Sequence, residues 1–249
     1  NCILAVEAST QLPFAEGLQR ERDLFNELEN TTEARALRYA FFGEREANKV
    51  PGLDASAPVR EIASAAVVGA GTMGGGIAMS FADFGIPVRI LEATQEALDR
   101  GMARIRANYE TSVKRGSLAQ DEMERRFARI TPVMSYDEIG DADAVVEAIF
   151  EQMEPKKAVF AKLDAVMKPG ALMLSNTSAL NIDEIASATK RPQDVAGAHF
   201  FSPANVMKLL EVVKGAKTSP DTMASTMAMG RKIGKISVGC GNCDGFLAN

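Results

Sequence analysis

The chain has 249 residues, of which 46% are hydrophobic and 24% charged, and its formal net charge at pH 7 is −5. This balance is that of an ordinary globular protein. The interspersed charges offer neither the basic patch of a nucleic-acid-binding protein nor the Lys/Arg run of a membrane-surface protein. No apolar stretch reaches the roughly 18 residues of a membrane-spanning helix, and the first residues lack the basic start of a signal peptide.

Residues 16–46 have helical spacing. Leu18, Phe25 and Leu28 fall on one face of a helix, and Thr31-Thr32 is expected to end this helix and cap the next one. Residues 48–60, NKVPGLDASAPVR, are rich in Pro, Gly and small side chains, which predicts a linker. We therefore expect residues 1–60 to hold two helices and a tether, with too little apolar surface for a core of their own.

From Ile62 onward, strand-like and helix-like segments alternate. Short runs rich in β-branched residues predict strands, and longer segments between them predict helices. The expected strands are 63–70, 87–92, 142–150, 170–176, 194–200, 208–215 and 235–239, and the expected helices are 71–85, 93–116, 117–130, 155–168 and 220–234. This alternation favours an α/β fold with a doubly wound, mostly parallel Rossmann-type sheet, preceded by a short helical connector.

The first expected turn of this sheet is rich in glycine. Gly69, Gly71 and Gly74 form a G-x-G-x-x-G pattern between a predicted strand and a predicted helix, with Thr72 and Met73 before the last glycine. In a dinucleotide-binding turn the first glycine permits a tight bend, the second lets the backbone approach a pyrophosphate, and the third lets helix and strand pack closely. The helix N-terminus then offers free N–H groups to the phosphates.

An acid at the end of the second strand supports this interpretation. Gly75 and Gly76 extend the glycine run and suit a flexible turn instead, but Glu92 lies 18 residues after Gly74. A carboxylate there accepts the ribose hydroxyls of NAD and repels the 2′-phosphate of NADP. Arg89 would favour NADP, but in a strand it alternates away from the residues that follow. By itself Glu92 also suits a solvated strand end; with the glycines it predicts NAD binding.

His199, the only histidine of the chain, ends a predicted strand. A single histidine in an apolar run is by default structural. The carboxyl ends of parallel strands, however, border the ligand crevice, and another strand ends there in SNTS, residues 175–178. Glu211 lies in the apolar strand KLLEVV, where a buried carboxylate needs a donor. A His199–Glu211 pair would fix the imidazole tautomer, whereas an edge strand would turn Glu211 towards solvent.

The three cysteines, Cys2, Cys240 and Cys243, suit a reducing compartment rather than a disulfide framework. CGNC has the spacing of half a zinc site or of a redox pair. No second cysteine pair accompanies it, so we interpret it as two small residues in a glycine-rich loop and expect no metal.

The sequence from residue 62 to 249 resembles the NAD-binding domain of 3-hydroxyacyl-CoA dehydrogenases. The blocks GAGTMGGGIA, VVEAIFE, SNTSAL, HFFSPANVMKLLEVV and DGFLAN occur in that family's order and at close to its spacing. The resemblance implies NAD-dependent oxidation of (S)-3-hydroxyacyl-CoA to 3-ketoacyl-CoA, with these two thioesters as substrate and product.

The resemblance also implies roles for catalytic residues. His199 would be the general base for the 3-hydroxyl proton, and Glu211 would orient and polarise it. Ser178 would hydrogen-bond the substrate oxygen, and Asn249 would match the family's asparagine at that oxygen.

Further residues would contact the cofactor. Asn176, Glu151 and Lys156 would line the nicotinamide side. Ser202 stands where many members have asparagine, so an amide contact there would be made by a hydroxyl or lost. Glu92 replaces the usual aspartate with a longer arm of the same charge.

The leading helices and HFFSP resemble a subgroup, the multifunctional β-oxidation enzymes. We therefore expect a slice of a longer polypeptide: residues 1–60 as connector helices from a preceding hydratase/isomerase domain, 61–240 as the NAD-binding domain, and 241–249 as the start of a helical C-terminal domain. The expected partners are those two domains, with no nucleic acid and no membrane span. The compartment would be cytoplasmic in a bacterium and peroxisomal in a eukaryote.

Two other functions remain open from the sequence. A Rossmann module could keep the glycine turn and bind NAD without catalysis. A dehydrogenase of a CoA-free hydroxy acid would use a lysine or arginine at the substrate carboxylate, and none lies in an analogous place.

Overall fold

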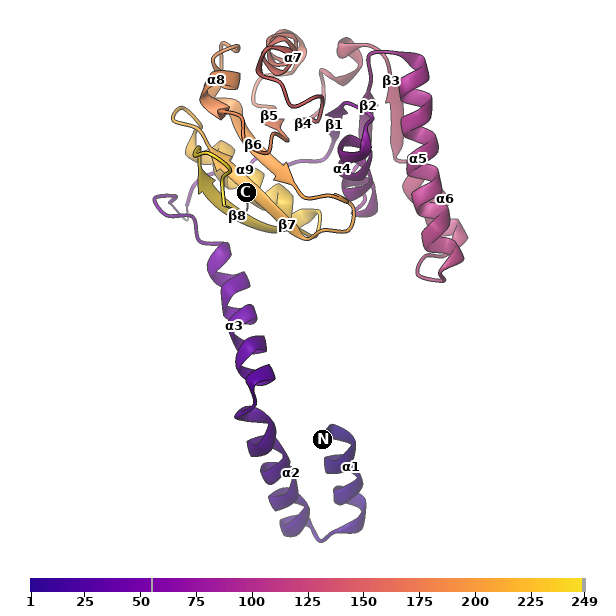
Figure 1. The fold of residues 1–249 in the computed structure, drawn as a ribbon, viewed down its shortest axis with the longest axis vertical. Coiled ribbons are helices and arrows are strands. Elements are labelled where there is room, and N and C mark those ends of the chain that lie inside the picture. Colours follow the sequence, from indigo (N-terminus) through magenta and orange to yellow (C-terminus); the bar gives the residue numbers. More distant parts are fainter. Residues whose placement is uncertain (55, 248–249) are drawn as a thin grey trace. The chain divides into compact units, whose positions relative to one another are not determined.

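The computed structural model describes residues 1–54 and 56–247. Contacts divide the chain into two compact units, Asn1–Glu46 and Ala47–Asn249. Figure 1 shows the helices of the first unit and the sheet of the second. The division falls before the boundary expected at residue 60, so the Pro- and Gly-rich segment packs with the second unit.

The first unit, all of whose residues are described, is helical. It contains α1 (Cys2–Gln11), α2 (Phe14–Glu29) and α3 (Thr32–Ala47), where the sequence predicted two helices. The expected break is confirmed, because the Thr31 hydroxyl accepts a hydrogen bond from the Ala34 N–H at 3.1 Å and so caps α3. Ala8 and Leu24 are its buried hydrophobic residues, too few for a core.

In the described part of the second unit, eight strands form one sheet in the order β3-β2-β1-β4-β5-β6-β7-β8. The strands are β1 (Ala65–Val68), β2 (Val88–Leu91), β3 (Ile130–Val133), β4 (Ala144–Glu147), β5 (Leu172–Ser175), β6 (Val195–Phe200), β7 (Leu209–Lys214) and β8 (Ile236–Gly241). Strands β1 to β6 are parallel, β7 is antiparallel to β6, and β8 is parallel to β7. The predicted α/β class and mostly parallel sheet are confirmed.

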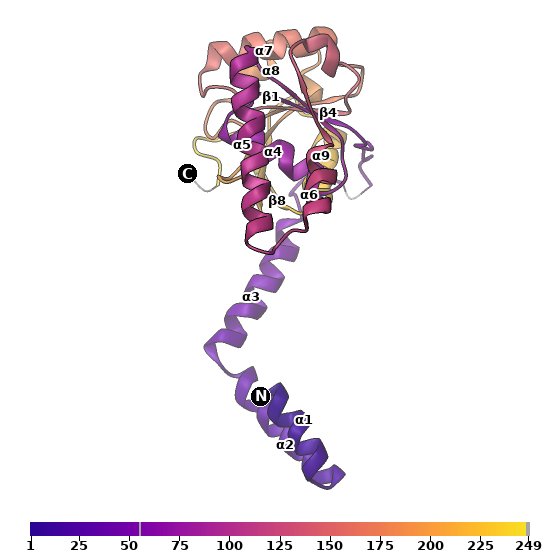
Figure 2. The same cartoon turned by 90° about the vertical axis from the view of Figure 1, so that its right-hand side faces the viewer.

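Helices cover both faces of the sheet, over two apolar cores. One core contains side chains of α4 (Thr72–Asp83), α5 (Gln95–Lys114), α6 (Gln120–Phe127) and α9 (Pro220–Lys232). The other contains side chains of α7 (Met153–Val166) and α8 (Ile182–Ala186). Figure 2 turns α5 and α6 towards the viewer. Two short 3-10 helices, η1 (Tyr136–Ile139) and η2 (Pro192–Asp194), complete the connections.

The sequence prediction missed α1, β3 and α8, as well as the 3-10 helices η1 and η2. The first residue of strand β3, Ile130, fell in the expected helix 117–130, and residues 131–133 were assigned to no element, because ITPV follows a charged helical run and includes Pro132. A proline is compatible with β3, since this strand lies at the edge of the sheet. Helix α8 spans five residues, too few to establish a helical period.

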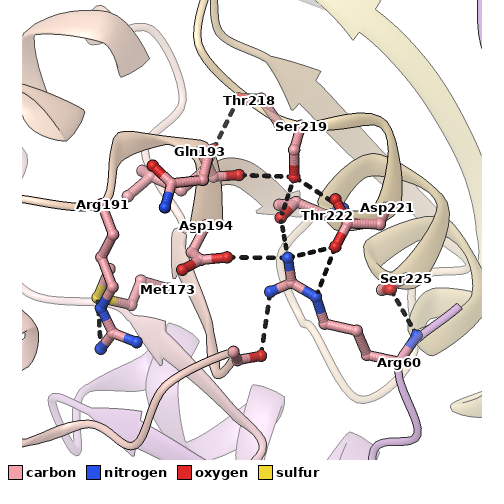
Figure 3. A network of polar contacts seen from close by, with 12 residues as sticks. Arg60, Met173, Arg191, Gln193, Asp194, Thr218, Ser219, Asp221, Thr222 and Ser225 are labelled. Carbon is pink, nitrogen blue, oxygen red and sulfur yellow. Dashed lines mark hydrogen bonds and ion pairs between the residues drawn. The ribbon is translucent and has the colours of Figure 1, made fainter. Parts of the chain in front are cut away.

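Within the second unit, Arg60 holds residues 47–60 against the sheet and its helices (Figure 3). Its guanidinium forms ion pairs with Asp194 at 2.8 Å and Asp221 at 2.6 Å. Its backbone N–H donates to the Ser225 hydroxyl at 2.8 Å. Residues 47–60 are therefore more than the tether that their composition predicted.

Among the described residues, no helix is both long and apolar enough to cross a membrane. Within the same residues, no three His, Cys, Asp or Glu side chains are grouped to hold a metal ion.

Cys240 is a buried free thiol and Cys243 an exposed one. Burial, with the nearby Glu211 carboxylate, raises the pKa of the Cys240 thiol to about 12, so it stays protonated and unreactive.

Candidate active site

The glycine turn joins β1 to α4 at the carboxyl edge of the sheet. Gly69 has φ +105°, and a Cβ there would lie 2.7 Å from the Ala148 carbonyl oxygen. A Cβ on Gly74 would lie 1.8 Å from the Gly69 oxygen, whereas one on Gly71 would meet no atom within 4 Å. The first and third glycines are thus required by packing. Gly71 borders open space, which fits a position where a phosphate approaches the backbone.

Glu92 lies directly after β2, against this turn. Its carboxylate accepts hydrogen bonds from the Ala70 N–H at 2.9 Å and from the Ala93 N–H at 2.7 Å. Arg89 forms an ion pair with Asp141. The predicted alternation is confirmed, because Glu92 faces the glycine turn and Arg89 does not.

The remaining glycines belong to α4 rather than to a flexible turn. Gly75 and Gly76 are buried inside that helix. A Cβ on Gly76 would lie 3.1 Å from the Ala204 Cβ, so the helix packs closely on residues 201–208, the loop that follows β6. The Ser80 hydroxyl contacts the Ala204 carbonyl oxygen at 3.1 Å, and the buried Lys235 ammonium donates to the same oxygen at 2.5 Å. Three contacts therefore fix this loop beside the glycine turn.

His199 and Glu211 lie directly opposite each other on β6 and β7. The His199 Nδ1 and Glu211 Oε2 atoms are 2.8 Å apart. Glu211 is fully buried and on an interior strand, so the solvent-facing alternative is wrong. Its second oxygen accepts from the Leu247 N–H at 3.2 Å. Since a carboxylate only accepts, Nδ1 carries the proton, and Nε2 of the neutral ring is left as the acceptor.

A cavity of about 460 Å³ opens beside this histidine. Its walls come from the glycine turn, the ends of β4, β5 and β6, and the loop after β6. The lining residues are Met73, Ala148, Ile149, Glu151, Asn176, Ser178, Ala179, His199, Phe200, Phe201 and Ser202. The cavity thus brings together five of the residues that the sequence predicted for the site, with Ser202 as a sixth.

Glu151 organises one side of the cavity. Its Oε1 atom accepts hydrogen bonds from the Ser178 N–H at 2.7 Å and from the Ser178 and Thr177 hydroxyls. Burial by itself raises the pKa of Glu151. The hydrogen bonds from Thr177 and Ser178, with the Lys156 ammonium nearby, outweigh burial and hold this pKa below its usual value. Glu151 therefore faces the cavity as an anion at neutral pH.

The other predicted residues are placed as follows. Asn176 lines the cavity, and its Oδ1 atom accepts from the Phe200 N–H at 2.9 Å, which leaves its NH2 group as the donor. Lys156 does not line the cavity; it is 1% exposed and lies beneath it. Thr72 begins α4 at the glycine turn. Asn249, predicted at the substrate oxygen, lies outside the described residues.

Sequence reasoning missed Glu147. This residue ends β4, is fully buried, and forms an ion pair of 2.7 Å with Lys156. A signal for it existed, because an acid inside the apolar run AVVEAIF, residues 144–150, is the same pattern that identified Glu211 in KLLEVV.

A neutral imidazole with a fixed tautomer can take a proton from a bound hydroxyl group. This base stands at the same sheet edge as the glycine turn and Glu92, where open α/β sheets bind dinucleotides. A dinucleotide-dependent dehydrogenase is the class of protein that such a fold and site define.

The sequence profile described as "3-hydroxyacyl-CoA dehydrogenase, NAD binding domain" matches residues 64–243. The chain therefore belongs to the 3-hydroxyacyl-CoA dehydrogenase family, in its NAD-binding domain, and NAD is the cofactor.

Individual relatives agree with this family. The peroxisomal bifunctional enzyme of Cavia porcellus is 44% identical over 100% of this chain and 35% of its own length. The solved structure of (S)-3-hydroxybutyryl-CoA dehydrogenase from Ralstonia eutropha is 32% identical, with a TM-score of 0.74 over 76% of this chain and 67% of that one. That of 3-hydroxybutyryl-CoA dehydrogenase from Escherichia coli is 40% identical, with a TM-score of 0.73 over 75% and 39%. The chain spans about a third of the length of the curated relative.

Proposed function

We propose that this chain is the NAD-binding part of an enzyme that oxidises (S)-3-hydroxyacyl-CoA to 3-ketoacyl-CoA in fatty-acid β-oxidation. The observation that carries the proposal is the buried His199–Glu211 contact of 2.8 Å at the wall of the cavity. It supplies a base with one free ring nitrogen beside the predicted nicotinamide position.

The residues of the chain divide the chemistry between them. His199 Nε2 accepts the proton of the 3-hydroxyl group, and Glu211 stabilises the imidazolium that forms. Ser178 and the amide of Asn176 lie on the same cavity, where they can orient the substrate oxygen and the nicotinamide. Bound NAD supplies the acceptor for the hydride that leaves C3.

The acyl-CoA site needs more than this chain. Hydride transfer requires the reacting carbon to be held against the nicotinamide with water excluded. We propose that a helical domain after residue 240 forms the second wall, and that residues 1–60 connect to a preceding hydratase domain. The compartment would be peroxisomal for a eukaryotic source, as the name of the Cavia porcellus relative says of that protein, and cytoplasmic for a bacterial one.

The test is His199→Gln in the full-length polypeptide, assayed by NADH-dependent reduction of acetoacetyl-CoA. The loss of the base should lower kcat about 10²–10⁴-fold. NADH affinity should stay within about twofold, because His199 contributes no charge to the glycine turn. Unchanged turnover would contradict a catalytic role of His199 and favour the alternative of an NAD-binding module without catalysis. Equal reduction of free acetoacetate would favour a dehydrogenase that acts on a CoA-free substrate.

A further inference from the structure

Two ionisable side chains are buried together beneath the cavity. Glu147 is fully buried and Lys156 is 1% exposed, and the Glu147 Oε1 and Lys156 Nζ atoms are 2.7 Å apart. Removing two charges from water costs as much as or more than their attraction returns, so a buried ion pair is a poor device for stability alone. Because Lys156 contacts Glu151 of the cavity wall, we expect this ion pair to have a function in the cavity.

Glu147 joins three segments that carry cavity residues. Its Oε1 atom accepts hydrogen bonds from Lys156 on α7 and from the Ile149 N–H at 2.8 Å. Its Oε2 atom accepts from the Ser175 hydroxyl at 2.7 Å, at the end of β5. Glu147 and Ser175 are also directly paired across the two strands. One carboxylate therefore sets the relative positions of β4, β5 and the start of α7.

Two routes lead from Glu147 to the cavity wall. Through Lys156, whose Nζ atom is 3.3 Å from the Glu151 Oε2 atom, it places the Glu151 carboxylate. Through Ser175, whose hydroxyl accepts from the Thr177 N–H at 3.3 Å, it places residues 176–178. Both routes meet where Glu151 accepts the Ser178 N–H at 2.7 Å. The wall that holds Glu151, Asn176 and Ser178 thus rests on one buried group.

We propose that Glu147 is a positioning residue of the nicotinamide side of the NAD site, acting through Lys156 and Ser175 on Glu151 and residues 176–178. The proposal rests on the dinucleotide site of the proposed function, but not on its acyl-CoA reaction. A substitution at Glu147 weakens NAD binding although Glu147 itself does not line the cavity.

The chain offers a matched control for a purely structural role. Asp194 is also a buried, ion-paired carboxylate, bound to Arg60 at 2.8 Å (Figure 3). It immediately precedes β6, so it lies at the amino edge of the parallel strands, opposite the cavity. Asp194→Asn removes a buried charge as Glu147→Gln does, without touching any contact of the cavity wall.

The experiment measures the NADH dissociation constant of the 249-residue chain from the fluorescence of bound NADH, with the free energy of unfolding from urea denaturation. Glu147→Gln leaves Lys156 facing an amide. It should weaken NADH binding about tenfold, the loss expected for a hydrogen bond to a charged group. Asp194→Asn should destabilise the chain but keep its NADH affinity within about twofold.

Ser175→Ala is the milder variant in case Glu147→Gln does not fold. It cuts the second route and should weaken NADH binding about threefold, a smaller loss because Lys156 keeps its carboxylate. The proposal is overturned if these variants bind NADH as tightly as the parent, or if Asp194→Asn loses affinity to the same degree. Failure of the proposed function would instead show as absent acetoacetyl-CoA reduction in a full-length parent that binds NADH.

Discussion

At the scale of single residues, the imidazole is bound at Nδ1 and packed against aromatic rings. Glu211 holds Nδ1 of His199, and the Phe201 ring lies with its centroid 4.5 Å from the imidazole centroid. Both oxygens of Glu211 are occupied by donors, so the carboxylate cannot turn away from the ring. The free nitrogen is therefore aimed by groups that themselves have little freedom.

Glu211→Gln tests this constraint. An amide accepts from Nδ1 less strongly and can also donate to it, which favours the wrong tautomer, so kcat for acetoacetyl-CoA reduction should fall at least about 10²-fold in the full-length polypeptide. Because the chain has one histidine, ¹⁵N NMR of labelled imidazole reports the tautomer directly. Glu154→Gln, at an exposed carboxylate of α7, is the control. An Nε2–H tautomer in the parent chain would contradict the prediction.

Substitution by alanine should destabilise the chain much more at Gly74 than at Gly71, although both glycines belong to the same turn. Gly74→Ala places a Cβ 1.8 Å from a backbone oxygen, which should cost about 3 kcal/mol of unfolding free energy or prevent folding. Gly71→Ala meets no atom and has φ −69°, so it should cost less than about 1 kcal/mol.

The NADH dissociation constant completes this comparison. The methyl group of Gly71→Ala would stand where a phosphate approaches, so affinity should fall about tenfold while stability is kept. If Gly71→Ala binds NADH as well as the parent, the pyrophosphate does not lie on this turn.

At the scale of elements, the sequence predicts what is long or periodic. The alternation after Ile62 predicted seven of the strands from their short, mostly apolar runs. It predicted helices α4, α5, α6, α7 and α9 from the longer segments between those runs. Strand β3 was not predicted, because it forms through pairing with its neighbour β2 and its own residues have no clear strand pattern. The role of Glu147 was not predicted for a similar reason. The sequence shows an acid at a strand end, but only the folded structure brings Lys156 into contact with it.

The start of β1 is fixed by one carboxylate. Asp143 accepts the Ala63 and Ser64 N–H groups, each at 2.8 Å, and forms an ion pair with Lys168. Burial raises the pKa of Asp143, but the Lys168 ammonium and these N–H groups lower it more, so the net pKa lies below the usual value. A lowered folded-state pKa contributes stability above the unfolded pKa of about 4, and this contribution is lost as pH falls through the folded-state value.

Asp143→Asn should therefore lower the free energy of unfolding by about 1–2 kcal/mol at pH 7. The difference from the parent should shrink as the solution is acidified below about pH 4, because the parent carboxyl then also becomes neutral. Urea denaturation followed by circular dichroism at several pH values measures both. A difference that stays constant across this range would mean that the Asp143 charge does not contribute.

At the scale of the whole molecule, the composition of residues 48–60 and their packing lead to different expectations. The Pro- and Gly-rich residues 48–60 have the composition of a tether, yet Val50 and Leu53 pack against the core of the second unit. Val50 approaches Gly239 so closely that a Cβ there would lie 2.7 Å from the Val50 side chain. Arg60 adds its ion pairs with Asp194 and Asp221.

Two truncations distinguish the packed segment from a tether. The truncated chain of residues 47–249 keeps all these contacts. Its free energy of unfolding in urea should therefore equal that of the second unit in the parent, within about 0.5 kcal/mol. Residues 61–249 lose the apolar contacts and leave Asp194 buried without its cation, which should cost about 3 kcal/mol or more. Arg60→Met in the longer truncation isolates the ion pairs from the apolar packing. Equal stability of the two truncations would mean that residues 47–60 cover the sheet unit without stabilising it.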